Sequence, residues 1–291
     1  MKKEAREKRF SFFRTFLLLS NVFLMILLLA SYAAWYINPK YFPELAFAGL
    51  AYPYLLAGNL LFILIWLLFK PKYLLLSLIT VLVGWNHVGR LFQLSSPGPD
   101  PETATDINVL SFNIQNFIKY NTSSTKYFKD FENEQKIHEF VVNYDADIVC
   151  LQEVLNDREN HQRFIHEFGK AINCPYTYFR NYYKTSKAKV DAIAVFSRYP
   201  IFKSGFLEYD EKTIAIFADL VIREDTVRLY NLHLASIHFR QEDIDFISEL
   251  PETQEQDKIK TGTRNVLSKL MLAFIKRGEQ ADIIARHIDN S

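Results

Sequence analysis

Three long apolar segments fill the first 94 residues of the chain. Residues 16–36 and 45–69 carry no formal charge, and residues 73–92 carry none before Arg90. An α-helix rises about 1.5 Å per residue, so about 20 apolar residues cross the roughly 30 Å hydrocarbon core of a bilayer. The pattern therefore predicts a membrane anchor, residues 1–94, that is built from three transmembrane helices.

Other interpretations of these segments fit less well. A cleaved signal peptide has an apolar stretch of only about 7–15 residues, and here two more segments follow the first. A transporter or channel needs ionisable residues that pair inside the membrane, and the segments offer no such pair. Pro53 lies inside the second segment, where a membrane bundle tolerates proline.

Basic residues are unevenly distributed among the segments that flank the apolar ones. The first 14 residues carry six basic and two acidic side chains, and the loop after the second segment carries Lys70 and Lys72 without an acid. The loop at 38–44 balances Lys40 against Glu44. Because cytoplasmic loops are enriched in Lys and Arg, we expect an integral membrane protein with its N-terminus in the cytoplasm. Three crossings of the lipid bilayer then place the C-terminal part in the periplasm or the extracellular space.

The pattern changes after the third apolar segment. Residues 95–106 are rich in proline and small polar residues, which is typical of a linker. In residues 107–291, short apolar runs alternate with helical spacing, which indicates an α/β layered sandwich. The apolar run at 147–151 is typical of a central buried strand. We expect strands at 108–112, 147–151, 192–196, 212–222 and 226–234, and helices at 133–144, 158–172 and 254–288, the last with a break at Gly278.

The net charge and the cysteine content limit which kinds of binding site and crosslink the chain can have. The formal net charge is +1 for the chain and −3 beyond residue 14, so the C-terminal part lacks the basic excess of most nucleic-acid-binding domains, which leaves room only for a local basic patch. Two cysteines are too few for a disulfide framework or a zinc cluster. Cys150 lies in an apolar run and is expected in the core, while a Cys150–Cys174 bridge stays open for a domain outside the cytoplasm.

Three polar residues share one kind of position. Asn113, Glu153 and His233 each follow an apolar strand run at its C-terminal end. Open α/β sheets place their ligand sites at such strand ends. A carboxylate and a carboxamide offer hard oxygen ligands for Mg²⁺ or Mn²⁺, and a histidine beside them can donate to a phosphate or move a proton. Taken singly, an Asn or Glu at a strand end is more often a solvated turn residue, and a lone His after an apolar strand is more often a hydrogen-bonded structural residue.

The sequence words around these residues occur in a defined order. They are VLSFNIQNF (109–117), DIVCLQEV (147–154), AIAVFSRYPI (192–201) and LYNLHLAS (229–236). Together they resemble the endonuclease/exonuclease/phosphatase superfamily, the DNase I-like metal-dependent phosphodiesterases. The resemblance covers residues 107–291.

The resemblance carries expectations for fold and chemistry. It implies a DNase I-like four-layer α/β sandwich, here placed after N-terminal transmembrane helices. It implies that Glu153 is the main ligand of Mg²⁺ or Mn²⁺, and that Asn113 contacts the same metal site. His233 would be catalytic and contact the scissile phosphate, and Asn231 would bind substrate. The implied reaction is an in-line attack of water on a phosphate ester.

Two further words of the superfamily do not occur in the sequence, a Gly-Asp-x-Asn strand end and a late Asp-His pair. We therefore expect the domain to be incomplete at its C-terminus, and we do not assign the role of that pair's histidine to His287. The leading hypothesis is a membrane-anchored, metal-dependent phosphodiesterase or nuclease-like hydrolase. The alternative is a truncated homologue without catalytic competence that acts as a binding or scaffold protein.

The substrate class stays open at this point. The superfamily's substrates imply a phosphodiester of nucleic acid or of a lipid or inositol phosphate head group. The aromatic and basic residues 177–189 would suit a polyanion, and they would equally suit a solvated strand and loop. No obligate protein partner is inferred.

Overall fold

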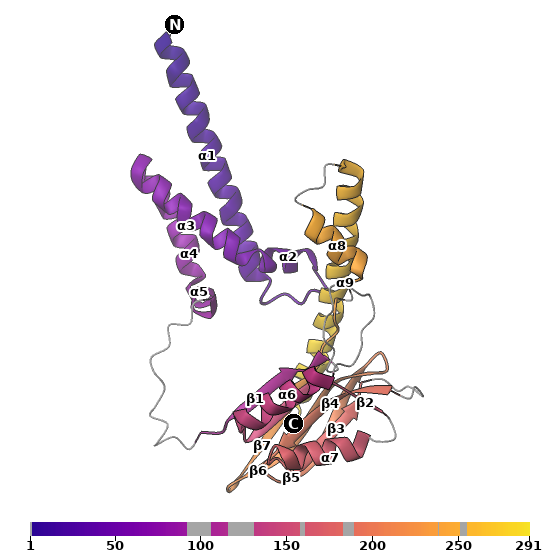
Figure 1. Cartoon of the computed structure of the whole chain (residues 1–291). Coiled ribbons are helices and arrows are strands. Elements are labelled where there is room, and N and C mark those ends of the chain that lie inside the picture. Colours follow the sequence, from indigo (N-terminus) through magenta and orange to yellow (C-terminus); the bar gives the residue numbers. More distant parts are fainter. Residues whose placement is uncertain are drawn as a thin grey trace. The chain divides into compact units, whose positions relative to one another are not determined.

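A computed structural model of the chain describes residues 2–91, 106–115, 131–157, 161–182, 189–237, 239–250 and 255–291 (Figure 1). The chain forms two compact units. Unit 1 contains Met1–Pro101 and Lys260–Glu279, and unit 2 contains Glu102–Ile259 and Gln280–Ser291. The long helix α9 (Gln256–Asp289) therefore contributes residues to both units. Most of the expected linker at 95–106 lies outside the described residues.

Unit 1 is built from apolar helices. In α1 (Lys2–Ala33) the stretch Ser11–Ala33 is long and apolar enough to cross a membrane, as is α3 (Tyr52–Phe69). A third crossing results if the short helix η1 (Pro71–Tyr73), α4 (Leu74–Val83) and α5 (Trp85–Leu91) form one span, which is bent by 66° before α5. The apolar character of the predicted segments is thus confirmed within the described residues.

The second and third segments differ from the continuous helices that were expected. The second consists of α2 (Glu44–Leu50) and α3, with a break at Ala51. Pro53 lies in the first turn of α3, where its missing N–H is no loss, so it begins a helix instead of interrupting one. Gly84 ends α4, and a Cβ at this position would lie 2.0 Å from the ring of Tyr32. Only glycine permits this contact.

Hydrogen bonds between side chains join the helices of unit 1. Asn21 of α1 is fully buried, and its Nδ2 donates to Ser77 Oγ of α4 at 2.6 Å. Trp66 of α3 donates from Nε1 to Asn21 Oδ1 at 2.8 Å. Polar side chains between apolar helices stabilise specific helix–helix contacts in a membrane. Apolar helix surfaces alone favour contact with another helix little more than contact with lipid. Asn21 therefore ties three helices together.

The expected break at Gly278 is wrong. Helix α9 continues through this residue, and Asn38 Nδ2 donates to the Gly278 carbonyl at 2.9 Å. A Cβ on Gly278 would lie 2.2 Å from Asn38 Oδ1. The glycine thus permits a close contact within unit 1 and does not end the helix.

The described part of unit 2 contains two sheets and several helical segments (Figure 1). Apart from the parallel pair β1–β2, all neighbouring strands are antiparallel. The first sheet has the order β1 (Val109–Asn113), β2 (Ile148–Asp157), β4 (Lys189–Ser197) and β3 (Tyr176–Asn181). The second has the order β5 (Ile201–Tyr209), β6 (Lys212–Ile222) and β7 (Asp225–Leu232). The helices are α6 (Phe131–Tyr144), α7 (His161–Ala171), α8 (Gln241–Glu249) and the end of α9.

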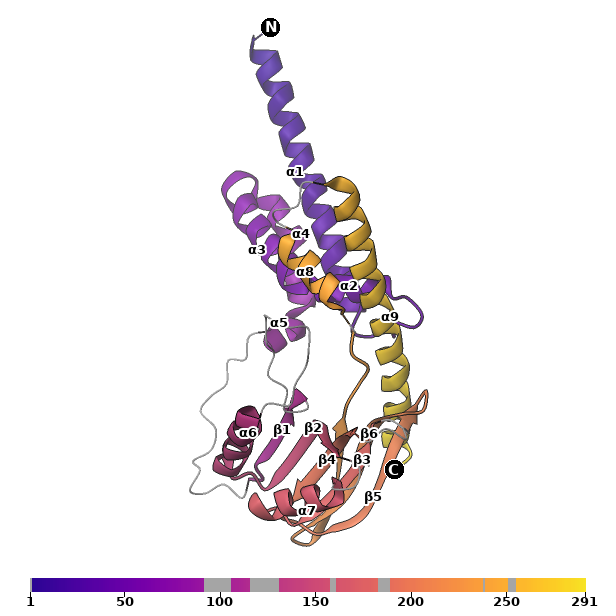
Figure 2. The same ribbon diagram turned by 45° about the vertical axis from the view of Figure 1, so that its right-hand side comes forward.

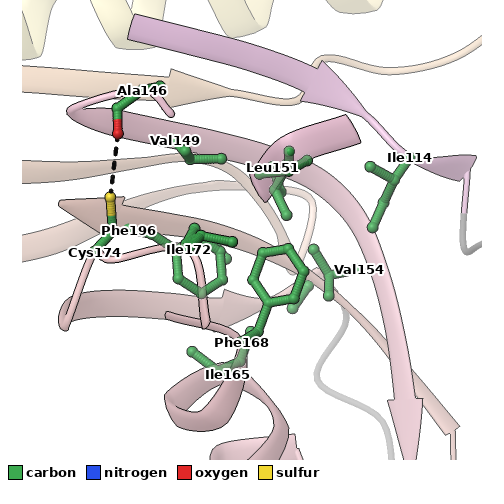
Figure 3. Packing of buried hydrophobic residues seen from close by; sticks show 13 residues of the cluster. Ile114, Ala146, Val149, Leu151, Val154, Ile165, Phe168, Ile172, Cys174 and Phe196 are labelled. Atoms are coloured by element: carbon green, nitrogen blue, oxygen red, sulfur yellow. Dashed lines mark hydrogen bonds between the residues drawn. The ribbon is translucent and has the colours of Figure 1, made fainter. Parts of the chain in front are cut away.

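One face of the first sheet packs against α6 and α7 (Figure 2). Alternate residues of a strand point to opposite faces, so Val149 and Leu151 of β2 face the helices. Phe168 and Ile165 of α7 pack against them together with Phe196 of β4 (Figure 3). Each of these five side chains is at most 5% exposed. This cluster forms the outer core of the domain.

The other face of the first sheet packs against the second sheet. Ile148 and Cys150 of β2 lie in one cluster with Ile216 and Leu220 of β6, all at most 4% exposed. Ile284 of α9 packs in a further cluster with Ile214 and Ala215 of β6. The layers run helix, sheet, sheet, helix, which confirms the four-layer α/β sandwich and the central position of the strand at 147–151.

Both cysteines are free and buried. Cys150 lies between the sheets, whereas Cys174 lies in the cluster under α6 and α7. The Cys174 thiol donates to the Ala146 carbonyl at 3.5 Å (Figure 3). Burial raises the pKa of the Cys150 thiol to about 12, so this thiol is unreactive at neutral pH. The core position expected for Cys150 is confirmed, and the bridge to Cys174 is not formed.

An ion pair stabilises the second sheet. Asp219 of β6 lies directly opposite Arg228 of β7, and the guanidinium donates two hydrogen bonds to it, Nε to Oδ1 at 2.5 Å and Nη2 to Oδ2 at 2.7 Å. The Asp219 side chain is 9% exposed. The hydrogen bonds from Arg228 hold the pKa of the Asp219 carboxyl below its ordinary value, against the opposing effect of burial.

We expect Asp219→Asn to lower the thermal stability of the full chain at pH 7. The pair stabilises the wild type fully above the ordinary pKa of aspartate, about 4, and this contribution is lost as the pH falls through the lower folded value. The melting temperatures of wild type and variant should therefore converge below about pH 4. Asp225→Asn, at an exposed position of the same sheet, is the matched control. A pH-independent difference for Asp219→Asn contradicts the assignment.

Candidate active site

Asn113 is the last residue of β1, as the sequence predicts. The parallel register sets it beside Gln152, and its Nδ2 donates to Glu153 Oε1 at 2.8 Å. Its Oδ1 accepts from the backbone N–H of Gln115 at 3.0 Å. This local bond fixes the orientation of the amide, because the oxygen faces the turn and the nitrogen faces Glu153.

Glu153 occupies a bulge within β2 and does not end the strand. Leu151 pairs with Ala194 and Val154 pairs with Ala192, so two residues of β2 face one residue of β4. Glu153 has φ 54°, a left-handed conformation that costs a non-glycine residue about 1–2 kcal/mol. A bulge redirects a side chain out of the regular ladder, and strain of this kind gathers at functional sites. The strand end expected from the sequence is corrected to a bulge, since β2 continues to Asp157.

His233 follows β7 directly and comes from the second sheet. Its backbone N–H donates to the Ile214 carbonyl at 2.9 Å, which holds it beside β6. Its Nε2 lies 3.1 Å from Glu153 Oε1, and its ring packs on Tyr182 with 4.7 Å between the ring centroids. Since the carboxylate can only accept, Nε2 carries the proton of this bond. The Nδ1 atom is buried and has no hydrogen-bond partner among the described residues.

The structure therefore brings the three predicted residues together. One oxygen of Glu153 accepts from Asn113 on the first sheet and from His233 on the second. The hydrogen bond from His233 is the main effect that lowers the pKa of the Glu153 carboxyl, and Asn113 adds to it, while burial opposes both. The lowered pKa keeps Glu153 ionised at neutral pH. Its side chain is 28% exposed, so a ligand from solution can reach it.

Asn231 lies close by but inside the core. Its side chain is 2% exposed, and its Oδ1 accepts from Gln152 Nε2 at 2.6 Å. Its Nδ2 donates to the carbonyls of Leu151 and Ala194. The role in substrate binding stays a prediction, and the contacts of Asn231 are with the two sheets.

Gln152 was missed in the sequence analysis. It is 7% exposed, and its amide contacts Asn231 from the opposite sheet. A signal was present in the sequence, because an amide in an apolar strand run is buried and must find a partner. The pattern alone did not identify that partner.

The donor set fits a hard divalent cation. Glu153 offers a carboxylate, whereas Asn113 turns its amide nitrogen and not its oxygen toward Glu153. Within the described ranges, no group of three or more His, Cys, Asp or Glu side chains is arranged to hold a metal ion. Because Mg²⁺ binds through one or two carboxylates and keeps several waters, the Glu153 carboxylate fits a cation that completes its shell with water and substrate oxygen.

Two other predicted features lie apart from this cluster. His287 Nδ1 bonds Tyr230 Oη at 2.8 Å on the outer side of the second sheet. The basic stretch at 177–189 is described only in part. Its Arg180 lies over the ring of Phe206 at 3.8 Å and 3.6 Å from Glu208, while residues 183–188 lie outside the described residues.

Comparison with known families decides the assignment. The model of the Endonuclease/Exonuclease/phosphatase family matches residues 110–267, more than half of the chain, and this stretch includes Asn113, Glu153 and His233. The chain belongs to this family. A second model, described as a domain of unknown function, matches residues 14–91, which include α1 from Arg14 onward and all of α3. The family assignment agrees with the two-sheet α/β fold.

Solved structures of the same family resemble parts of the chain. An endonuclease/exonuclease/phosphatase family protein from Leptotrichia buccalis matches with 13% identity and a TM-score of 0.34, over 52% of this chain and 64% of that one. An endonuclease/exonuclease/phosphatase from Beutenbergia cavernae matches with 16% identity and a TM-score of 0.36, over 46% of this chain and 39% of that one. The 3′ phosphatase NExo from Neisseria, bound to a product DNA hairpin, matches with 14% identity and a TM-score of 0.30, over 44% and 41%.

The chain thus spans less than two thirds of the length of each of these structures. No curated protein matches it in a sequence search.

Replacement of His233 by alanine should raise the pKa of Glu153 toward the ordinary carboxyl value, because the largest lowering effect is removed. The titration is followed by ¹³C NMR of the full chain with labelled glutamate, in detergent and without divalent cations. His287→Ala removes a histidine outside the cluster and should leave the Glu153 titration unchanged. An unchanged pKa in His233→Ala is evidence against the hydrogen bond between the two sheets.

Proposed function

We propose that the chain is a membrane-anchored, metal-dependent phosphodiesterase whose family domain faces the periplasm or the extracellular space. One observation carries the proposal. Glu153 accepts hydrogen bonds from Asn113 and His233, which come from two different sheets, in a chain of the Endonuclease/Exonuclease/phosphatase family. At this partly exposed position, the Glu153 carboxylate, which would bind a cation, lies beside His233, which is a hydrogen-bond donor.

Each residue has a distinct role in the proposed reaction. Glu153 would hold Mg²⁺ or Mn²⁺, with Asn113 beside the same site, and the bound metal would polarise a phosphoryl oxygen and stabilise the leaving oxyanion. Asn113 orients the Glu153 carboxylate through its Nδ2 hydrogen bond. His233 Nε2–H donates to the Glu153 carboxylate in the unbound site, and in the substrate complex it would turn to donate to a phosphate oxygen instead.

The proposed substrate is a phosphodiester of nucleic acid or of a lipid or inositol phosphate head group. Apolar helices in the same chain favour a substrate at a lipid surface, since α1 and α3 are long enough to span a bilayer. A bilayer is the partner that this reading requires. Activity on DNA, on phospholipid vesicles and on inositol phosphodiesters is therefore compared in parallel.

Full-length protein in detergent micelles should hydrolyse bis(p-nitrophenyl) phosphate or one of these substrates with Mg²⁺ or Mn²⁺, and a chelator should abolish the reaction. Glu153→Gln should lower kcat/KM by at least about 100-fold, because several kcal/mol of transition-state stabilisation are lost with the metal ligand. Activity is measured by product release at saturating metal.

Glu139→Gln, an exposed carboxylate of α6, is the matched control and should keep full activity. Unchanged hydrolysis in Glu153→Gln contradicts the assignment.

A second candidate is a binding or scaffold protein without turnover. It is favoured by the site itself, which brings one carboxylate and one histidine together within the described residues. Wild-type protein that binds Mn²⁺ and hydrolyses none of the substrates supports this second candidate.

The proposed orientation is tested in intact cells with variants that each carry one introduced cysteine. Lys170 of α7 and Lys72 between the second and third apolar segments are both exposed. A membrane-impermeant maleimide should label Lys170→Cys in intact cells and Lys72→Cys only after lysis. The native cysteines give little background, because both are buried. The reverse labelling pattern excludes the proposed orientation.

A further inference from the structure

Two amide side chains connect the sheets directly behind the candidate site. Gln152 belongs to β2 and Asn231 to β7, and both are at most 7% exposed. Gln152 Nε2 donates to Asn231 Oδ1 at 2.6 Å. Gln152 lies on the same face of its strand as Ile148 and Cys150, which form part of the apolar layer between the sheets. An amide in such a layer is costly unless it is hydrogen-bonded, so this pair has a strongly preferred geometry.

Asn231 also bonds to the strands that form the bulge. Its Nδ2 donates to the Ala194 carbonyl at 2.8 Å and to the Leu151 carbonyl at 3.1 Å. These two residues are the last regular pair of β2 and β4 before the register shift. Asn231 of the second sheet is thus hydrogen-bonded to both β2 and β4 of the first sheet, at the point where the pairing of these two strands becomes irregular.

The amide pair is linked to the candidate site through short segments of backbone. Gln152 directly precedes Glu153, and its carbonyl accepts from the Ile114 N–H at 3.1 Å, next to Asn113. Asn231 precedes His233 by two residues. Displacement of the amides by a few tenths of an ångström is therefore transmitted to Glu153 and to His233, whose own contact is 3.1 Å long.

We propose that Gln152 and Asn231 are positioning residues that hold Glu153 and His233 within hydrogen-bond distance across the two sheets. The proposal rests on the proposed function of this site. Both amides are buried, and both act through the residues that follow them in sequence. Gln152 and Asn231 thus set the geometry of the Glu153–His233 contact.

The test variant is Gln152→Met, which keeps the length of the side chain and removes the donor to Asn231. Val195→Ala is the matched control, because it creates a cavity in the same layer between the sheets and removes no side-chain hydrogen bond of either amide. All proteins are full-length and are compared at a temperature at which both variants are folded. This comparison separates a loss of stability from a loss of site geometry.

Three readouts are used. The Nε2–H signal of His233 is recorded by ¹⁵N NMR of histidine-labelled protein and assigned with His233→Ala among the seven histidines of the chain. The Mn²⁺ dissociation constant is measured by electron paramagnetic resonance. In Gln152→Met we expect the His233 signal to shift or broaden, Mn²⁺ affinity to fall about 10-fold, and kcat to fall about 10- to 100-fold with a smaller change in KM. Val195→Ala should leave all three unchanged.

A His233 signal and an Mn²⁺ affinity in Gln152→Met that equal those of Val195→Ala overturn the proposal, because the amides then contribute stability alone. If Gln152→Met does not fold, Gln152→Asn takes its place, since it keeps an amide that is one methylene too short to reach Asn231. Wild-type protein that neither binds Mn²⁺ nor hydrolyses a phosphodiester refutes the proposed function. The His233 signal still decides the positioning role in that case.

Discussion

The contact between Glu153 and His233 crosses from one sheet to the other, and this contact defines the candidate site. A layer of aliphatic side chains resists separation of the sheets, but it sets their lateral position only loosely because apolar contacts are not directional. Hydrogen bonds supply the direction. Gln152 and Asn231 provide them at the bulge that turns Glu153 out of its strand. The site therefore depends on buried polar contacts as much as on its exposed residues.

Much of unit 2 could be predicted from the pattern of apolar residues. A long strand was expected at 212–222, where β6 has these same bounds, and Asn113 ends β1 as expected. Glu153 lies with Asn113 and His233 as expected, but it occupies a bulge within β2 and not the end of a strand. A bulge adds one residue to one strand of a pair, and this mismatch is visible only when the partner strand is known.

Features that depend on distant contacts could not be predicted. Strand β5 has exposed residues on both faces over its first half, so its alternation is weak and its pairing with β6 determines it. Pro53 was placed inside a helix because the apolar run continues through it, whereas the preceding turn at Ala51 ends one helix and begins the next. The amide pair behind the site escaped prediction for the same reason, since 79 residues separate its members.

The placement of the two cysteines has a consequence for the biogenesis of the protein. Cys150 and Cys174 lie on opposite sides of the first sheet, in separate clusters, so the sheet itself keeps the thiols apart. The folded domain therefore contains no covalent crosslink that an oxidising compartment must form or a reducing one would break. Its fold is indifferent to the redox potential of the compartment that surrounds it. In the membrane-anchored arrangement that we propose, the charges that flank the helices would therefore have to set the orientation, because failure to fold would not eliminate a chain that is inserted the wrong way round.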